Sequence, residues 1–167
     1  ARALVTLAFK LQEGDDGFDA LLEQLLDQYE KNLGLKSELF PGIRELLEKL
    51  SQHNIAWGIA TNKPARFTQP LMARTQLPNL PASTICPDDV EQRKPHPESL
   101  HIACKEIGCD LNEAIYIGDH LRDIQCGQNA GMDTIAAAYG YIIDGDKPEN
   151  WQADAIIDHP REILQWI

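Results

Sequence analysis

The chain has 167 residues, of which 43% are hydrophobic and 25% charged, and its formal net charge is −11 at pH 7. This length suits one compact domain with a small appendage, and the apolar fraction is sufficient to build a buried core. The acidic balance argues against nucleic acid and anionic membrane surfaces as partners, because both require clustered lysine and arginine. A small phosphorylated substrate remains compatible, since one cation or lysine in a cleft reverses the sign of the local charge.

The four cysteines, at positions 86, 104, 109 and 126, form neither a C-x-x-C pair nor a zinc pattern with histidine. We interpret them as partly buried thiols in a reducing compartment. We find no signal-peptide pattern and no apolar run long enough to cross a bilayer, so a cytoplasmic protein is expected.

The first part of the chain, to about Leu35, carries a helical pattern and contains no strand candidate. Apolar residues recur at spacings of three and four between Phe18 and Tyr29, after a break at residues 13–17. Gly34 is the expected helix stop. The sequence opens at Ala1 without Met and already inside a helical pattern, which we interpret as the start of a fragment.

From Phe40 onward, helices alternate with short apolar runs. The pattern predicts strands at 55–60, 83–86, 114–117, 134–138 and 155–157, and helices at 42–53, 65–75, 98–107, 122–129 and 161–167. This alternation indicates an α/β fold with a doubly wound, Rossmann-like parallel sheet covered on both faces. Ligands bind such sheets at the carboxyl ends of the strands, so we expect the functional residues just after each strand.

Polar residues that ordinary packing does not require stand at these positions. Thr61 ends the first predicted strand in I-A-T-N-K. Asp119 and Asp123 follow the third in G-D-H-L-R-D, four residues apart across a strand-to-helix turn. Lys94 lies between Thr61 and Asp119 in the chain, in R-K-P-H-P, where two prolines fix the backbone at the start of a helix.

These residue types together suit phosphoryl transfer. Two close carboxylates repel each other unless a hard divalent cation joins them. Phosphoryl transfer needs neutralised charge on the phosphoryl oxygens, which Thr61 and Lys94 can supply, and a metal clamp, which Mg²⁺ on Asp119 and Asp123 can supply. Each feature alone has an ordinary explanation, as a turn residue, a surface lysine or a helix cap. Their joint occurrence at strand ends favours a phosphate-and-metal site.

The three segments resemble motifs II, III and IV of haloacid dehalogenase superfamily phosphatases, and the likeness runs from Leu39 to the C-terminus. The stretch P-G-I-R-E-L-L-E-K-L before the first strand is similar to the phosphoglycolate phosphatase branch, which carries a helical cap inserted after the first strand. Three further stretches resemble the N-acetylmuramic acid 6-phosphate phosphatases of cell-wall recycling. They are T-N-K-P-A-R-F, I-C-P-D-D-V-E-Q-R-K-P-H-P, and A-A-A-Y-G-Y-I with the following W-Q-A-D-A-I-I-D-H-P.

The resemblance implies a partial helical cap at 1–38, an α/β phosphatase core at 39–167 and a reaction through an aspartyl-phosphate intermediate. The expected substrate is N-acetylmuramic acid 6-phosphate, a metabolite of peptidoglycan recycling, with phosphoglycolate as the alternative. Arg2 is a candidate substrate-binding residue, because cap arginines of related enzymes face the substrate. Asn62, directly after the motif II threonine, is a second candidate.

The resemblance also assigns roles in the reaction. Thr61 would hydrogen-bond the transferring phosphoryl group, and Lys94 would neutralise it and position the nucleophile. Asp119 would bind Mg²⁺, and Asp123 would support the metal directly or through water.

The sequence departs from the family at motif I, because it contains no D-x-D-G-T. The nucleophilic aspartate is therefore expected upstream of Ala1, and the fragment is expected to be inactive. In the family the motif I strand lies between the strands that end here at Thr61 and Asp119. Without it the sheet would lack its first central strand and expose unpaired backbone groups. We expect another segment or protomer to fill the gap, in a domain-swapped or fragment-completed oligomer.

Three alternatives remain open at this stage. A haloacid dehalogenase shares the fold but needs no metal, which the pair Asp119 and Asp123 contradicts. A receiver-like signalling domain also uses Asp, Thr and Lys after parallel strands, but the order of the motifs is different. A non-catalytic binding relative that has lost motif I is the third.

Overall fold

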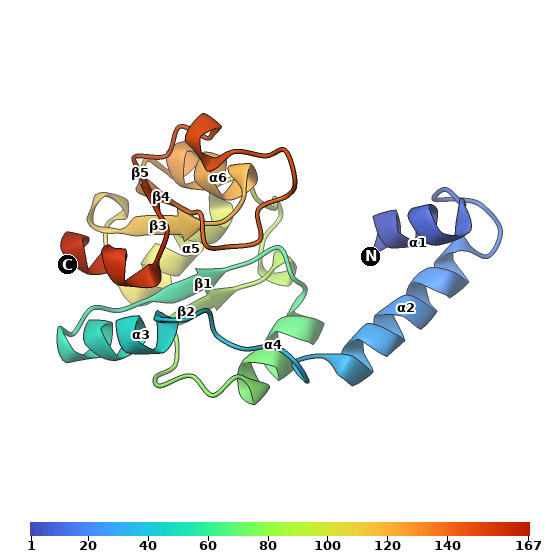
Figure 1. Ribbon diagram of the computed structural model, residues 1–167, viewed down its shortest axis with the longest axis horizontal. Helices are drawn as coiled ribbons and strands as arrows, with labels where there is room; N and C mark the ends of the chain where they lie inside the picture. The colour runs from blue at the N-terminus through green and yellow to red at the C-terminus, as the bar shows by residue number, and fades with distance from the viewer.

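The computed structural model describes residues 1–167. Its first two helices, α1 (Arg2–Phe9) and α2 (Phe18–Asn32), form a hairpin that projects from the rest of the chain (Figure 1). Val5, Phe18 and Leu22 are the buried centre of this hairpin, and they form a hydrophobic cluster of their own. The helical pattern of the first 35 residues thus folds into two helices separated at the glycine-containing break.

The rest of the chain alternates helices and strands. The helices are α3 (Ile43–Gln52), α4 (Ala65–Arg74), α5 (Glu98–Ile107) and α6 (Leu121–Ala130). The strands are β1 (Gly58–Ala60), β2 (Ser83–Ile85), β3 (Ile115–Gly118), β4 (Asp133–Ala137) and β5 (Ala155–Ile157). Short 3-10 helices lie at Pro87–Asp89, Leu111–Glu113 and Pro148–Asn150, and a longer one, η4 (Pro160–Trp166), ends the fold.

All strand pairings are parallel, and they fall into two sheets. β1 pairs with β2, and β3, β4 and β5 form a second sheet in that order. The predicted α/β fold with parallel strands is confirmed. β1 and β3 are not paired with each other, so the sheet is divided between the two strands that were expected to flank the absent one.

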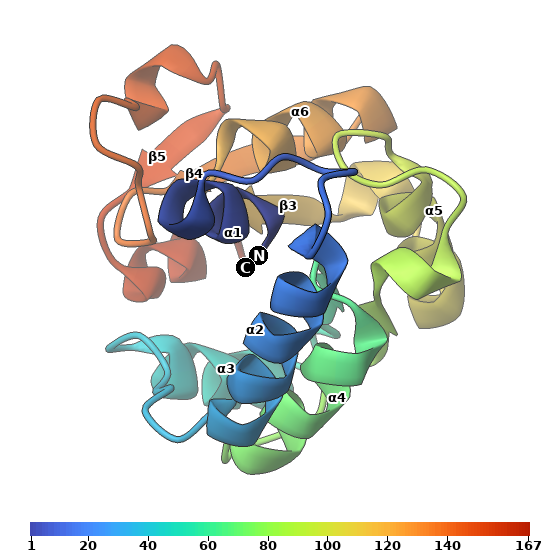
Figure 2. The same cartoon turned by 90° about the vertical axis from the view of Figure 1, so that its right-hand side faces the viewer.

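Helices cover both faces of the strands (Figure 2). On one face, α3 and η4 supply Leu46, Leu50 and Ile163, which pack in one cluster with Ile135 and Ile157 of the second sheet. On the other face, α5 and α6 pack together around a cluster of Leu100, Cys104, Cys126, Ala130 and Met132. Successive side chains of each strand point to opposite faces of the sheet, so each strand contributes to both helical layers.

Two predicted elements differ from the structure by more than one residue at an end or in helix type. The strand expected at 55–60 is limited to Gly58–Ala60, because the N–H of Ile55 donates to the carbonyl of Leu50 at the end of α3 instead of to a neighbouring strand. The terminal helix expected at 161–167 is the 3-10 helix η4. Its seven residues make it longer than most 3-10 helices, which rarely exceed about four residues.

The helical hairpin is attached to the core through α2 and α4. The ring of Tyr29 meets that of Phe67 edge-on, with centroids 5.2 Å apart. The guanidinium of Arg66 lies 2.7 Å from a carboxylate oxygen of Glu30 and 3.4 Å from one of Asp27. Exposed ion pairs contribute little stability, so the aromatic contact is the apolar part of this attachment.

Candidate active site

Lys94 is the centre of the candidate site. Its ammonium lies 2.7 Å from Oδ1 of Asp123, 2.8 Å from the carbonyl oxygen of Ala60 and 3.0 Å from the hydroxyl of Tyr116. Only 9% of the Lys94 side chain and 11% of the Asp123 side chain are exposed. Because an ammonium has three N–H donors, these three partners satisfy it fully. Lys94 therefore connects the end of β1 to β3 and α6.

Asp123 stands in the first turn of α6, next to the end of β3. A Cβ on Gly118 would lie only 2.2 Å from the Cβ of Asp123, so the absence of a side chain at this position lets the helix start close to the strand. The His120 side chain caps α6 by accepting a hydrogen bond from the N–H of Arg122. The spacing of four residues thus places Asp123 beside the Gly118-Asp119 turn.

Asp119 is held from the other side by the loop after β4. Its Oδ2 accepts a hydrogen bond from the N–H of Tyr141 at 3.0 Å. A Cβ on Gly140 would come within 2.2 Å of the Asp119 Cβ, so this approach also requires glycine. No hydrogen bond engages Oδ1 of Asp119, which leaves that oxygen available to a ligand.

Thr61 and Asn62 occupy the turn after β1. The N–H of Thr61 continues the sheet by donating to the carbonyl of Ile85, and its hydroxyl accepts from the N–H of Lys63 at 3.0 Å. The Asn62 amide donates to the backbone carbonyl of Lys94 at 3.4 Å. The structure therefore joins the turn after β1 to the Lys94 loop, and Lys94 joins both to Asp123.

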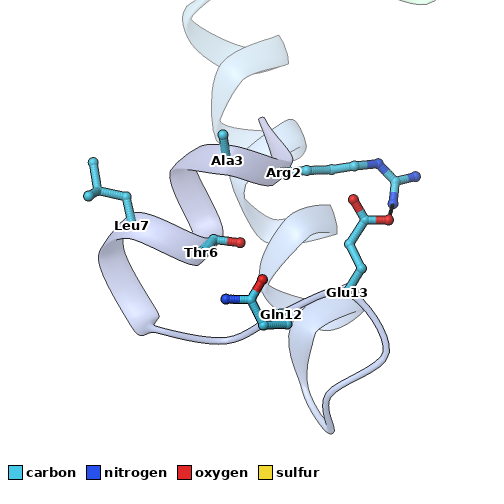
Figure 3. A pocket seen from close by; sticks show the side chains of 6 residues that line it. All are labelled: Arg2, Ala3, Thr6, Leu7, Gln12 and Glu13. Atoms are coloured by element: carbon cyan, nitrogen blue, oxygen red, sulfur yellow. Dashed lines mark hydrogen bonds and ion pairs between the residues drawn. The ribbon is translucent and has the colours of Figure 1, made fainter.

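Arg2 is not brought to this group. It pairs with Glu13 at 2.7 Å, with both side chains about 60% exposed. It lines a pocket of about 770 Å³ whose walls come only from α1 and the following loop (Figure 3). The chain places no residue of the β-strand ends in this pocket, and the substrate-binding role of Arg2 stays a prediction.

The residues fit a hydrated Mg²⁺ better than a full protein cage. No group of three or more His, Cys, Asp or Glu side chains is placed to hold a metal ion. Asp123, predicted as a metal ligand, has one oxygen paired with Lys94, whereas Asp119 keeps a free oxygen. Mg²⁺ commonly takes one or two carboxylates together with waters and substrate phosphate. Asp119 is therefore the ligand that this chain offers most directly.

Tyr116 was not among the residues singled out from the sequence. It lies within β3, and its hydroxyl accepts from Lys94 and donates to the carbonyl of Ala60 at 3.2 Å. Burial raises the pKa of the Tyr116 phenol far above its ordinary value, and the charge of Asp123 adds to the rise. The group is therefore a neutral hydroxyl at physiological pH. The available signal was a tyrosine inside an apolar strand, because a phenol that packs into the protein usually requires a hydrogen-bond partner.

Comparison with known proteins agrees with this geometry. The family model described as haloacid dehalogenase-like hydrolase matches residues 5–137, which is most of the chain. The chain belongs to the haloacid dehalogenase-like hydrolase family. Its predicted membership of this superfamily is thereby confirmed, and the strand-end motifs around Thr61, Lys94 and Asp119 lie within the matched residues.

Several family members resemble the chain along almost its whole length. An N-acetylmuramic acid 6-phosphate phosphatase of Pseudomonas putida is 44% identical over 100% of this chain and 75% of its own length. The protein of that name from Pseudomonas aeruginosa is 42% identical over 98% of this chain and 73% of its own. A phosphoglycolate phosphatase of Xanthomonas campestris is 35% identical over 99% of this chain and 74% of its own.

The structural comparison gives the same family. The crystal structure of a Haemophilus somnus protein, named there as a predicted phosphoglycolate phosphatase, superposes with a TM-score of 0.86 at 25% identity. It covers 96% of this chain and 71% of that one. In the present structure no helix is both long and apolar enough to cross a membrane.

Proposed function

We propose that this protein is a Mg²⁺-dependent phosphomonoester hydrolase that acts on N-acetylmuramic acid 6-phosphate, and that the present chain supplies the part of its site that binds phosphate and metal. The observation that carries the proposal is the junction around Lys94, where a buried ammonium meets the ends of β1 and β3 beside Asp119. The two relatives that are 44% and 42% identical to the chain over the aligned residues support the choice of substrate.

The residues of the chain divide the work as follows. Thr61 and the neighbouring backbone present hydrogen-bonding groups to the phosphoryl oxygens at the end of β1. Lys94 contributes a fixed positive charge, and Asp123 holds its ammonium in place at 2.7 Å. Asp119 would hold Mg²⁺, which when bound supplies the positive charge that stabilises the transferring phosphoryl group.

The nucleophile is a separate part of the proposal. The aspartyl-phosphate chemistry of the family needs a D-x-D-G-T aspartate, and the 167 residues contain none. We propose that it lies upstream of Ala1 in the full gene product and reaches the site at the division between β1 and β3. Catalytic assays therefore require the full gene product.

Phosphoglycolate is the second candidate substrate. It is favoured by the Xanthomonas campestris relative, which is 35% identical over 99% of the chain. Both candidates are small phosphomonoesters, so the phosphate and metal contacts are the same for either. Residues outside the Lys94 junction have to distinguish a sugar acid from a two-carbon acid.

The test is a comparison of phosphate release from the two substrates, with Mg²⁺ and after removal of the metal with EDTA. We expect faster hydrolysis of N-acetylmuramic acid 6-phosphate and loss of turnover in EDTA. Faster hydrolysis of phosphoglycolate would make phosphoglycolate the assigned substrate. Undiminished rates in EDTA would overturn the proposed requirement for Mg²⁺.

Asp119→Asn tests the proposed ligand directly. We expect a fall in kcat of about 100-fold or more, because an electrostatic contact to the transition state is lost, with an unchanged circular dichroism melt. Asp133→Asn is the matched control, since Asp133 is an exposed carboxylate at the amino end of β4, away from the strand ends that carry the site. Wild-type rates in Asp119→Asn would remove it from the metal site.

A further inference from the structure

The hydroxyl of Tyr116 occupies a position that joins three parts of the site. It accepts a hydrogen bond from the Lys94 ammonium at 3.0 Å and donates one to the carbonyl of Ala60 at 3.2 Å. Tyr116 belongs to β3, and Ala60 is the last residue of β1. The hydroxyl therefore bridges two strands that share no backbone pairing.

The direction of these hydrogen bonds follows from the groups involved. Lys94 is only a donor and the Ala60 carbonyl is only an acceptor, whereas a phenol is both. One hydroxyl proton and the oxygen lone pairs of Tyr116 meet these two requirements together. Phenylalanine at this position would fill nearly the same space and satisfy neither.

A lysine side chain needs such contacts to be held in one place. Four methylene groups carry its charge, and fixing them costs rotamer entropy. Asp123 and the Ala60 carbonyl restrain the Lys94 ammonium from two directions, at 2.7 and 2.8 Å. The third N–H has Tyr116 as its partner, so the ammonium is fixed from three sides.

We propose that Tyr116 is a positioning residue that acts through Lys94, and that its hydroxyl holds the ammonium where the phosphoryl group binds at the ends of β1 and β3. This inference rests on the proposed phosphatase function. It adds to that function a residue inside a strand, outside the motifs that carry the family resemblance. Tyr116 is not expected to touch the substrate.

The variant Tyr116→Phe removes the hydroxyl and keeps the ring. The matched control is Tyr29→Phe. Tyr29 packs edge-on against Phe67, with ring centroids 5.2 Å apart, and its hydroxyl also accepts a hydrogen bond from a lysine, Lys63, but at an exposed position outside the Lys94 junction. Two measurements are made on both variants. The first is steady-state kinetics of the full gene product with Mg²⁺. The second is the ammonium signal of Lys94 in a ¹⁵N NMR spectrum, which is visible only when hydrogen bonds slow its proton exchange with water.

For Tyr116→Phe we expect kcat to fall about tenfold or more while KM changes less than about twofold, as for an interaction made mainly in the transition state. The Lys94 ammonium signal should be broadened or lost. Tyr29→Phe should preserve both the rate and the signal. A lower melting temperature with unchanged kcat would show a purely structural role and overturn the proposal.

The two measurements separate this inference from the proposed function. If the wild-type protein hydrolyses neither substrate, the proposed function fails, and the ammonium signal still tests whether Tyr116 holds Lys94. An unchanged signal in Tyr116→Phe overturns the positioning role whatever the kinetics show. A lost signal with wild-type kcat and KM also overturns it, because the position of the ammonium would then have no effect on the reaction.

Discussion

Lys94 and Asp123 form an ion pair that is almost completely withdrawn from water. The two charged atoms lie 2.7 Å apart, and about one tenth of each side chain is exposed. Removing two charges from water costs several kcal/mol per ion, which their attraction and additional hydrogen bonds must offset. The further contacts of Lys94 with Ala60 and Tyr116 supply part of that compensation. The proposed function therefore explains the presence of the pair better than stability does.

We predict that Lys94 and Asp123 are strongly coupled in their contribution to the free energy of unfolding. Lys94→Met and Asp123→Asn should each lower the free energy of unfolding by about 3–5 kcal/mol, because each leaves an uncompensated buried group. The double variant should lose clearly less than the sum of the two. Urea unfolding of the 167-residue chain at neutral pH measures all three values.

An exposed pair provides the control. Arg161 and Glu45 also approach to 2.8 Å, but 64% and 46% of their side chains are exposed. Arg161→Gln should therefore change the free energy of unfolding by less than about 1 kcal/mol. The interpretation of the Lys94 pair would be wrong if its single variants were as mild as this control, or if their effects were additive.

At the scale of whole elements, Asp154 connects two strands of the second sheet. Its carboxylate accepts hydrogen bonds from the N–H of Thr134 at 2.7 Å and from the Thr134 hydroxyl at 2.8 Å. Thr134 is fully buried in β4, and Asp154 directly precedes β5. These hydrogen bonds hold the pKa of Asp154 below its usual range, since they favour the ionised form.

The lowered pKa predicts that Asp154 contributes to stability in a pH-dependent way. A carboxyl group whose folded pKa lies below its unfolded value, about 3.9, stabilises the fold above that value. The contribution disappears as the pH falls through the folded pKa. We therefore expect Asp154→Asn to be less stable than wild type at pH 6 and closer to it at pH 3. Urea midpoints across this range measure the effect, and a difference that grows on acidification would contradict it.

The elements that the sequence predicted well have local signals at both ends. Helix α5 occupies the predicted residues 98–107 and ends at Gly108, whose φ of 82° suits glycine. Strand β5 also has the predicted bounds, 155–157. The shortened β1 depends on how α3 ends, because the N–H of Ile55 donates to the carbonyl of Leu50 while Asn54 adopts a φ of 55°. Asn54 was the local signal for this helix end, since asparagine is second to glycine at such left-handed positions.

The candidate site also contains some residues that the sequence indicated and others that it did not. Thr61, Lys94 and Asp119 could be singled out as candidates because their residue types follow or lie between predicted strands, where parallel sheets bind ligands. The pairing of Asp123 with Lys94 was not, because 29 positions of chain separate them and nothing in the spacing measures their distance. Tyr116 was missed because a tyrosine between two isoleucines reads as part of an apolar strand.

At the scale of the whole molecule, side chains rather than backbone pairing connect the two sheets. Trp57 and Ile55, beside β1, pack against the same hydrophobic cluster as Ile135 and Ile157 of the second sheet. Lys94 adds a polar link, since its ammonium contacts the last residue of β1 and, through Asp123, helix α6. The core is therefore continuous where the sheet is divided.

The division between the sheets leaves one edge of β1 without a strand partner. The N–H of Thr61 donates to Ile85 of β2 at 2.9 Å. Because successive backbone groups of a strand point to opposite sides, the N–H groups of Gly58 and Ala60 point away from β2, toward β3. The carbonyl of Ala60 does so as well, and it is met by side chains of Lys94 and Tyr116 instead of by a strand.

We predict that hydrogen exchange of the 167-residue chain, followed by NMR, alternates along β1. The amides of Gly58 and Ala60 should exchange much faster than that of Thr61, because only Thr61 donates to a neighbouring strand. Ile135, in the central strand β4, is the reference for full protection, since β4 is paired on both sides. Equal protection of Ala60 and Thr61 would contradict the divided sheet and would show that another segment or a second copy of the chain pairs with β1 in solution. Measuring exchange at two protein concentrations separates these two, because only pairing with a second copy depends on concentration.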